Sequence, residues 1–285
     1  MTDPTEYSAA FLEADEITRR GLWSELQSFA MEDPARHYFI LLGLLNPEKT
    51  FQSVITLRAR DDKLKAAYFQ RSSGNAQLMM SPDLLKPAIQ PESLRPFAEA
   101  IRRIGFNQLI AAASYCKQLE PFNLFVSHFI GAEISVMSPG IAASEALNKE
   151  IHYDLNPLKV EDLDEIIDLY QRCFHSFTPR PIMEEKLLAA RGHGVVVREN
   201  GRIIGCAQSE FESPHQALIV GVATEPEARG RGIASACVAG LINSLATPER
   251  SFALQYDNPS AGRIYKRLGF VPVDHVGHYH FRREQ

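Results

Sequence analysis

The sequence is poor in the residues that mark several specialised protein classes. It has four cysteines and one tryptophan in 285 residues. No two cysteines have the Cys-x-x-Cys spacing, which argues against a zinc ribbon and against a dense disulfide framework. We interpret them as buried apolar thiols in a reducing cytoplasm; they are Cys116, Cys173, Cys206 and Cys237.

Long apolar runs and an excess of positive charge are also missing. No apolar run approaches the ~20 residues that cross a bilayer, and acids occupy the start of the chain, where a signal peptide is basic. The 30 Lys and Arg stand against 35 Asp and Glu, a net charge of -5. A nucleic-acid binder usually carries the opposite sign. These absences predict a cytoplasmic protein that binds neither membrane nor nucleic acid.

The length and the composition indicate a folded chain of two domains. Hydrophobic residues make up 45% and charged residues 23% of the sequence, which is ordinary globular usage. At about 150 residues per domain, the chain has the length of two. Strand and helix patterns are mixed in both halves, so we expect an α/β (mixed α+β) protein. We place the boundary between Gly140 and Asn156 and predict domains 1–145 and 146–285.

The first half has secondary-structure signals but no catalytic motif. Apolar spacing predicts a helix over Tyr7–Met31, followed by an apolar run over His37–Leu45. Alternating segments predict a hairpin and a further strand, and a helix-like region interrupted at Gly105 follows a proline-spaced stretch. The predicted strands are Ser53–Ala59, Leu64–Gln70 and Ala76–Met80, and the last region is Phe97–Leu119.

The second half has sharper signals. The Asn-Gly step of Glu199-Asn200-Gly201 predicts a tight hairpin between two strands, and an apolar stripe from Val160 to Phe174 predicts an amphipathic helix. The other expected helices are Ile182–Ala190, Gly232–Leu245 and Pro259–Leu268. The other expected strands are His152–Leu155, Leu218–Ala223, Phe252–Tyr256 and a terminal pair near Phe270–Val273 and His278–Phe281.

One stretch, Leu218–Ser235, combines a strand, a glycine-rich turn and a helix. Such a turn exposes backbone N–H groups at the positive end of a helix, where a phosphate or pyrophosphate binds. Gly230 and Gly232 allow close approach, and Arg229 and Arg231 add positive charge. The stretch has neither GxxxxGK[ST] nor a third glycine, which excludes a P-loop and a full dinucleotide fingerprint.

At these residues the sequence resembles the GNAT superfamily of acyl-CoA-dependent N-acetyltransferases. The family signature is matched by Arg229, Gly232 and Ala234. A second match lies downstream, where a helix from Asn258 ends in Tyr265-x-x-x-Gly269-Phe270. The resemblance covers about Asn156 to Phe281. It implies a mixed, mostly antiparallel sheet flanked by helices.

The resemblance also implies where coenzyme A binds. Coenzyme A would lie between the strands Leu218–Ala223 and Phe252–Tyr256, with its pyrophosphate on the backbone amides of the turn. The amide of Val222 would polarise the thioester carbonyl as a single oxyanion donor. The cofactor-binding residues expected on this basis are Val222, Ala223, Thr224, Arg229, Gly230, Arg231, Gly232, Ile233, Ala234, Ser235, Asn258, Ala261 and Tyr265.

The reaction implied by the family needs an acid and, for a charged acceptor, a base. Tyr265 occupies the family position of the acid, which would assist the departing thiolate. Glu210 and Glu212, expected on one face of a strand, are our candidates for the base. Glu225 and His215 are alternatives. Three histidines near the end of the chain lack a partner with ligand spacing, so we expect no metal; they are His275, His278 and His280.

We therefore expect transfer of an acetyl group from acetyl-CoA to a primary amine of a small molecule or protein, within a ternary complex. The alternative is a non-catalytic acyl-CoA-binding sensor. The first half lacks the Arg-x-x-Gly-x-Ala loop. It is either a degenerate GNAT-like domain that walls the acceptor cleft or an unrelated packing or dimerisation domain, and a homodimer stays open.

Overall fold

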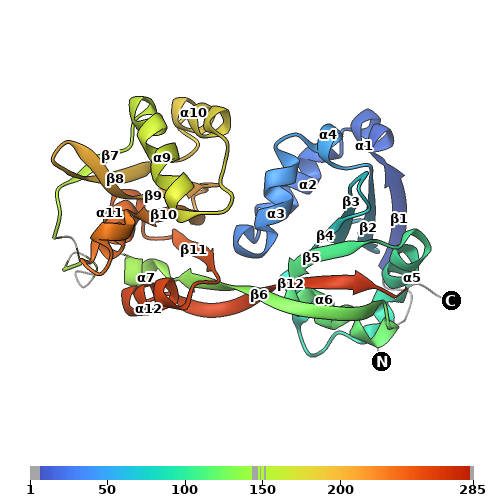
Figure 1. Ribbon diagram of the computed structural model, residues 1–285. Coiled ribbons are helices and arrows are strands. Elements are labelled where there is room, and N and C mark those ends of the chain that lie inside the picture. Colours follow the sequence, from blue (N-terminus) through green and yellow to red (C-terminus); the bar gives the residue numbers. More distant parts are fainter. Residues whose placement is uncertain (1–6, 143–146, 148, 151, 283–285) are drawn as a thin grey trace. The chain divides into compact units, whose positions relative to one another are not determined.

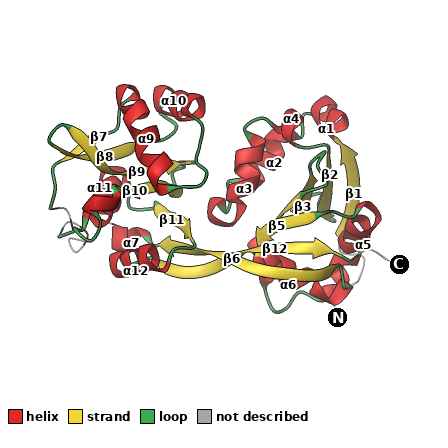
Figure 2. Cartoon of the chain, viewed as in Figure 1, coloured by secondary structure: helices red, strands yellow, loops and turns green. Residues whose placement is uncertain are grey.

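In the computed structural model the chain forms two compact units, each with helices and strands (Figure 1, Figure 2). Residues 7–142, 147, 149, 150 and 152–282 are described. The first unit runs to Glu133 and takes up the chain again from Asp274, whereas the second unit is Ile134–Val273. The prediction of two mixed α/β regions did not anticipate that the last residues return to the first unit.

The first unit is built on strands in the order β1-β2-β3-β4-β5-β12-β6. Strands β1 to β4 are antiparallel neighbours, and β4 and β5 are parallel. The predicted bounds of three strands are confirmed. The strands are β1 (Tyr7–Glu13), β2 (Ser53–Ala59), β3 (Leu64–Gln70), β4 (Ala76–Met80) and β5 (Gln108–Ala112), and the helices are α1 (Ala14–Arg20), α2 (Trp23–Ala30), α3 (Pro34–Leu44), α4 (Pro47–Thr50), α5 (Arg95–Ile104) and α6 (Ala113–Leu119).

Two predicted helices of this unit are wrong in part. The helix over Tyr7–Met31 begins as strand β1, which pairs with β2 along its whole length, and Gly21 then separates two helices at φ 65°. The region Phe97–Leu119 breaks at Gly105, as expected, but holds β5 between two helices. In both places tertiary strand pairing overrides a local pattern that also fits a helix.

The second unit has the order β12-β6-β11-β10-β9-β8-β7. The hairpin at Glu199–Gly201 is confirmed, with Asn200 at φ 52° and Gly201 at φ 80°. The strands are β7 (Leu155–Pro157), β8 (Gly194–Glu199), β9 (Arg202–Glu210), β10 (Gln216–Thr224) and β11 (Ser251–Tyr256), and the helices are α7 (Pro139–Ala142), α9 (Leu163–Cys173), α10 (Arg180–Leu188), α11 (Ile233–Leu245) and α12 (Pro259–Leu268). The strand expected at His152–Leu155 lies slightly later, and Ile151 is outside the described residues.

Two long strands contribute to both units. Strand β6 (Phe125–Met137) passes from the first unit to the second at Glu133, and β12 (Val271–Phe281) returns at Asp274. Strand β6 was not predicted from the sequence, and β12 was predicted as two strands. Because β12 returns at Asp274, the strands of the first unit come from two separate segments of the sequence, whereas the strand residues of the second unit all lie within Ile134–Val273.

A buried carboxylate fixes the end of the chain within the first unit. Asp274 accepts hydrogen bonds from Arg36 Nε at 2.7 Å and from the Ser114 backbone N–H at 3.2 Å, at the start of α6, and from the Ser114 hydroxyl. Its side chain is only 5% exposed. Although burial alone would lower it, the carboxylates of Asp33 and Asp274 hold the pKa of Arg36 above its usual value.

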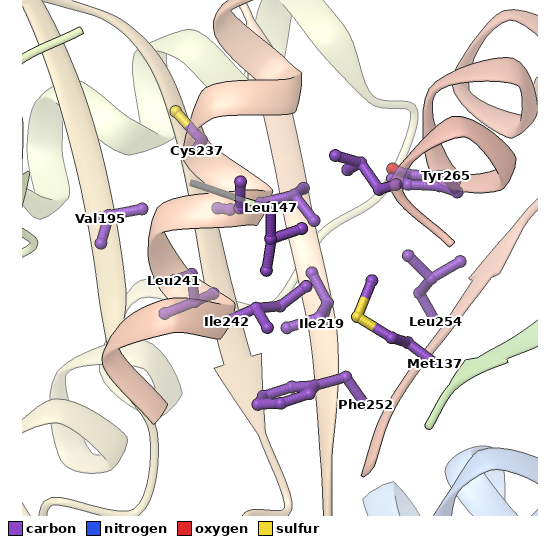
Figure 3. Close-up of a cluster of buried hydrophobic side chains, with 14 of the residues drawn as sticks. Met137, Leu147, Val195, Ile219, Cys237, Leu241, Ile242, Phe252, Leu254 and Tyr265 are labelled. Atoms are coloured by element: carbon purple, nitrogen blue, oxygen red, sulfur yellow. The ribbon is translucent and has the colours of Figure 1, made fainter. Parts of the chain in front are cut away.

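The second unit has an apolar layer on each face of its sheet. On one face, residues of α11 such as Leu241 and Ile242 pack with Ile219 and Phe252 from the strands (Figure 3). On the other face, α9 packs against alternate strand residues, among them Cys206. Alternation along the strands thus separates a face covered by α11 and α12 from a face covered by α9 and α10.

Candidate active site

The site begins where two parallel strands part. Strands β10 and β11 pair through three residue pairs, the last of which is Leu218 with Ala253. Both strands continue, to Thr224 and Tyr256. The family resemblance implied that coenzyme A lies between these two strands, which do not pair with each other beyond Leu218 and Ala253.

A bulge lies in β10 just beyond the point of parting. The register with β9 passes from Val220–Gln208 to Ala223–Cys206, so that Gly221 and Val222 face a single residue of β9. Gly221 adopts φ 58°. An extra residue in one strand leaves backbone groups outside the ladder. The peptide between Gly221 and Val222 is therefore available for interactions other than sheet pairing.

The glycine-rich turn leads into the N-terminus of α11, a helix of 13 residues. Gly232 precedes the helix at φ 83° and caps it without a side-chain hydrogen bond. A Cβ at Gly230 or Gly232 would meet no atom within 4 Å, so the space above both residues is open. Unpaired helix amides beside open space form a site for an anion such as a pyrophosphate.

The side chains around the turn hold it in place. Arg231 forms an ion pair with Glu199 of the β8–β9 hairpin, which lowers the pKa of that carboxyl. The hydroxyl of Tyr153 donates to the carbonyl of Arg231 at 2.8 Å. Arg267 of α12 donates to the Ser235 hydroxyl at 2.6 Å, in the first turn of α11. These contacts come from strand β8, from the loop before β7 and from helix α12, and they support the turn and the first turn of α11.

Tyr265 lies in α12, where it is 7% exposed. Its ring is 5.3 Å from that of Tyr256 and 6.0 Å from that of Phe270, between centroids. Burial raises its pKa to about 12. At neutral pH its hydroxyl is therefore protonated and can donate a hydrogen bond.

Asn258 and Ala261 lie at the start of the same helix. The Asn258 side chain accepts a hydrogen bond from the Ser260 backbone N–H at 2.9 Å and so caps α12. Ala261 is half-buried and packs against the apolar layer of α11. Asn258 thus has a structural role in addition to any contact with a ligand.

The two candidate bases lie in different surroundings. Glu210 is the last residue of β9, is 5% exposed and pairs with Lys186 at 3.2 Å. Phe211 then turns the chain at φ 48°. Glu212 contacts the Ser209 hydroxyl and His193 Nδ1, the latter at 2.9 Å. The expectation that both carboxylates share a strand face is wrong, because the strand ends between them.

The alternative bases are tied to other surface groups. Arg172 donates hydrogen bonds to both carboxylate oxygens of Glu225, which lowers the pKa of Glu225. His215 is exposed and lies 3.8 Å from Glu249.

The first unit has an equivalent helix with different residues. Asn123 at φ 54° follows α6 and a 3₁₀ turn, as Gly269 at φ 102° follows α12. Counting back eight residues from each gives Tyr115 and Ala261, and counting back four gives Leu119 and Tyr265. The first unit thus has a large tyrosine where the second has the small Ala261, and it has a leucine, without a hydroxyl, where the second has Tyr265.

The terminal histidines lie in ordinary packing. His278 stacks on Phe129 with centroids 4.3 Å apart, and burial lowers its pKa. No group of three or more His, Cys, Asp and Glu suited to a metal occurs among the described residues. In the same part of the chain, no helix is long and apolar enough to cross a membrane.

Sequence comparison places a known family in the second unit. Residues 163–270 match the model of the Acetyltransferase (GNAT) family. This range includes the parted strands, the bulge, the glycine-rich turn and Tyr265. No curated protein matches the chain in sequence.

Solved structures with the same fold cover nearly the whole chain. A tandem GNAT protein from the clavulanic acid biosynthesis pathway is 15% identical, with a TM-score of 0.61 over 98% of this chain and 100% of its own. A GNAT-family acetyltransferase from Colwellia psychrerythraea is 11% identical, with a TM-score of 0.63 over 96% and 100%. A GCN5-related N-acetyltransferase from Sphaerobacter thermophilus is 14% identical, with a TM-score of 0.57 over 100% and 98%.

The TM-scores show a shared fold, and at identities of 11–15% these structures show the fold alone. The second unit is a GNAT domain, and the first is GNAT-like, so the chain has a tandem GNAT fold. The predicted fold class is thereby confirmed, and so is the interpretation of the first half as a GNAT-like copy.

Proposed function

We propose that the second unit is an N-acetyltransferase, which transfers an acetyl group from acetyl-CoA to a primary amine. One observation carries the proposal. Strands β10 and β11 part immediately before a bulge in β10, and the same strand leads into a glycine-rich turn at the start of α11. The family matched by this region supports acetyl-CoA as the acyl donor.

The residues present fit acetyl-CoA. We assign the pyrophosphate to the amides of Arg231–Ala234, where the space above Gly230 and Gly232 is open. The backbone of Val222 and Thr224 would pair with the pantetheine arm, with Asn258 and Ala261 on the side of β11. The remaining residues proposed to contact the cofactor are Ala223, Arg229 and Ser235.

The chemical step is a direct attack. The amine nitrogen forms a bond to the thioester carbon, and the carbon–sulfur bond breaks with its electron pair on sulfur. The Val222 N–H stabilises the negative charge on the carbonyl oxygen. Tyr265, protonated because burial raises its pKa to about 12, donates a hydrogen bond to the departing sulfur.

The nitrogen must lose a proton in the same step, and we propose Glu210 as the base, since it lies on the face of β9 that contacts α9 and α10. Gln208 and Cys206, at alternate positions of β9, contact Tyr170 of α9, and Glu210 continues that face to Lys186 of α10. Glu212 instead bonds Ser209, which points to the opposite face. We propose that Glu210 takes the proton through a water molecule, and that Glu212 orients His193.

The role of the first unit is the next part of the proposal. We propose that this unit shapes the choice of acceptor or the assembly of the protein, and that the acceptor is a small-molecule amine or a protein lysine. The homodimer, the cytoplasmic location and the domain bounds 1–145 and 146–285 stay predictions.

The proposal is tested with a panel of amines and detection of free coenzyme A. Polyamines, aminoglycosides, amino acids and lysine peptides form the panel. Acetyl-CoA at 100 times its dissociation constant should stabilise the protein by roughly 2.7 kcal/mol. Gly232→Glu should abolish both effects, because it places a carboxylate where the pyrophosphate binds.

Gly21→Glu is the matched control. Gly21 also has a positive φ, 65°, and open space within 4 Å, but it ends helix α1 in the first unit. It should leave binding and turnover intact. If acetyl-CoA stabilises neither the wild type nor the control, the proposal is wrong. Stabilisation without release of coenzyme A across the panel would instead support the acyl-CoA sensor.

A further inference from the structure

The carbonyl group of the β10 bulge is held by a buried tyrosine. Tyr170 of α9 is 2% exposed, and its hydroxyl donates to the Gly221 carbonyl at 2.9 Å. A Cβ at Gly221 would lie 2.1 Å from this hydroxyl. The close approach and the positive φ of 58° both require glycine at this position. Tyr170 and Gly221 thus form one fitted contact.

A chain of hydrogen bonds fixes the direction in which Tyr170 donates. Lys186 Nζ donates to Gln208 Oε1 at 3.2 Å, which leaves the Gln208 amide N–H to face Tyr170 at 2.6 Å. Because Gln208 donates to the tyrosine oxygen, the tyrosine proton is free to go to Gly221. Lys186 is in turn anchored by Glu210 at 3.2 Å. Tyr170, Lys186, Gln208 and Glu210 are all at least 91% buried.

The chemistry of the hydroxyl suits this role. Burial raises the pKa of Tyr170 well above its usual value, so the group stays neutral and keeps its proton. The rings of Phe174 and Phe177 pack against it with centroids 5.1 Å and 5.5 Å away. The side chain has one position and one proton to donate.

Peptide geometry connects this contact to the proposed oxyanion donor. The carbonyl of Gly221 and the N–H of Val222 belong to one planar trans peptide, so they point in opposite directions. Holding the carbonyl toward Tyr170 fixes the Val222 N–H on the other side of the strand. We propose that Tyr170, oriented by Gln208, is a positioning residue that aims the Val222 N–H. This inference rests on the proposed function of that N–H.

Tyr170, Lys186 and Gln208 were not predicted from the sequence as site residues. The available signal was Gly221, an isolated glycine within a strand pattern, which indicates a bulge or a close backbone approach. The partners on α9 and α10 could not be identified from spacing, because they lie 51 and 35 positions earlier in the chain.

The test compares Tyr170→Phe with Tyr68→Phe. Tyr68 is the matched control: it is fully buried, and its hydroxyl donates at 3.0 Å to the carbonyl of Gly105, a glycine with φ 68° in the first unit. Both variants keep the ring and lose one buried hydrogen bond. Amide hydrogen exchange over residues 220–224 reports the bulge directly and does not depend on activity.

In Tyr170→Phe we expect exchange in this segment to be about 10-fold faster and kcat to fall roughly 10- to 100-fold. The KM for acetyl-CoA should stay within about 2-fold. Tyr68→Phe should change neither the exchange of this segment nor kcat. Gln208→Glu is a second variant, in which the carboxylate attracts the Tyr170 proton away from Gly221, and it should act in the same direction.

Unchanged exchange at residues 220–224 in Tyr170→Phe, or an equal change in Tyr68→Phe, would overturn the inference. A fall in kcat shared by both variants would also contradict it. If the wild type proves unable to bind acetyl-CoA, the proposed function fails, and the exchange measurement still decides whether Tyr170 holds the bulge.

Discussion

Each unit has two parallel strands that part, but the side chains beside the parting point differ in size between the two units. In the first unit β4 and β5 pair at two positions, Ala76–Leu109 and Gln77–Ile110, before they part. Beside this point His37 bonds the Tyr115 hydroxyl at 2.8 Å and the Met80 backbone, and both side chains are buried. Counted back from the left-handed residue that follows each helix, Ala261 of the second unit corresponds to Tyr115 of the first. In the first unit the bulky side chains of His37 and Tyr115 therefore lie beside the parted strands, whereas in the second unit the corresponding helix position has only the methyl group of Ala261.

The segments that follow β4 in the first unit and β10 in the second also differ in the residues that lead into the next helix. The first unit has prolines there, with 3₁₀ turns at Pro82–Leu85 and Pro91–Leu94, and α5 has a further proline in its first turn. Proline has no N–H to donate. The second unit also has a 3₁₀ turn that begins with a proline, Pro226–Ala228, but there Gly230 and Gly232 stand between this turn and the helix α11. A shared strand order is therefore not enough for cofactor binding, which also needs free backbone amides at the start of the helix and open space beside them.

The largest effect is expected from Asp274→Ala, which removes the carboxylate that fixes the end of the chain in the first unit. It leaves the Arg36 guanidinium, 20% exposed, with one ion-pair partner fewer. Breaking such a buried pair costs about 3 kcal/mol of unfolding free energy. The protein's one tryptophan, Trp23, lies in α2 of the first unit, so its fluorescence in denaturant reports that unit.

Asp83→Ala is the control for this measurement. Asp83 has ion pairs with Lys65 and Lys86, but its side chain is 52% exposed, so little change is expected. Acetyl-CoA binding by the second unit should survive Asp274→Ala under native conditions. An unchanged Trp23 transition would show that the C-terminal strand does not stabilise the first unit.

Tyr265→Phe should reduce kcat by about 100-fold, which corresponds to about 2.7 kcal/mol of transition-state stabilisation. The ring packing against Tyr256 and Phe270 is kept, so the affinity for acetyl-CoA should not change. Tyr115→Phe removes a buried hydroxyl from the equivalent helix of the first unit and should leave kcat as it is. Steady-state kinetics with a reactive amine provide the measurement. A fully active Tyr265→Phe enzyme would remove Tyr265 from the mechanism.

Ala261→Tyr transfers the residue of the first unit into the second. A tyrosine at this position should obstruct the space beside the parted strands and weaken acetyl-CoA binding by about 10-fold or more, since overpacking typically costs about 1–3 kcal/mol. Calorimetric titration with acetyl-CoA measures the effect. Ala261→Ser, which adds one atom, should bind nearly normally. Undiminished affinity in Ala261→Tyr would mean that the helix start does not border the cofactor.

The smallest effect is a dependence on pH that belongs to the first unit. Burial lowers the pKa of His37 from its usual 6.5. A depressed pKa contributes stability that is present above 6.5 and is lost as the pH falls through the folded value. The Trp23 unfolding transition should therefore move to lower denaturant as the pH falls below 6.5. His37→Gln should flatten this dependence, and an equally steep one would assign it to other groups.

Local chemistry decided which parts of the fold could be predicted. The Asn200-Gly201 turn and the helix over Pro259–Leu268 were predicted correctly, because turn residues and caps act over a few positions. Strand β1 was not, because most of its side chains are exposed and only its pairing with β2 makes it a strand. The return of β12 to the first unit depends on Asp274 and partners 160 and 238 positions away.

The same distinction applies to the candidate site. The glycine-rich turn and Tyr265 could be found from the sequence because their motifs are contiguous. Glu210 pairs with Lys186 of α10, and Gly221 accepts a hydrogen bond from Tyr170 of α9. Both contacts form only where these helices pack on the sheet. No spacing rule within one segment encodes such contacts.

We expect that the second unit binds acetyl-CoA between its parted strands, and that the first unit does not, because buried side chains lie beside its own parted strands. Isothermal titration of the wild-type protein tests it most directly, with Gly232→Glu and Gly21→Glu titrated in parallel. We predict one acetyl-CoA per chain in the wild type and in Gly21→Glu, and none in Gly232→Glu. Two equivalents per chain, or binding that survives Gly232→Glu, would contradict the account.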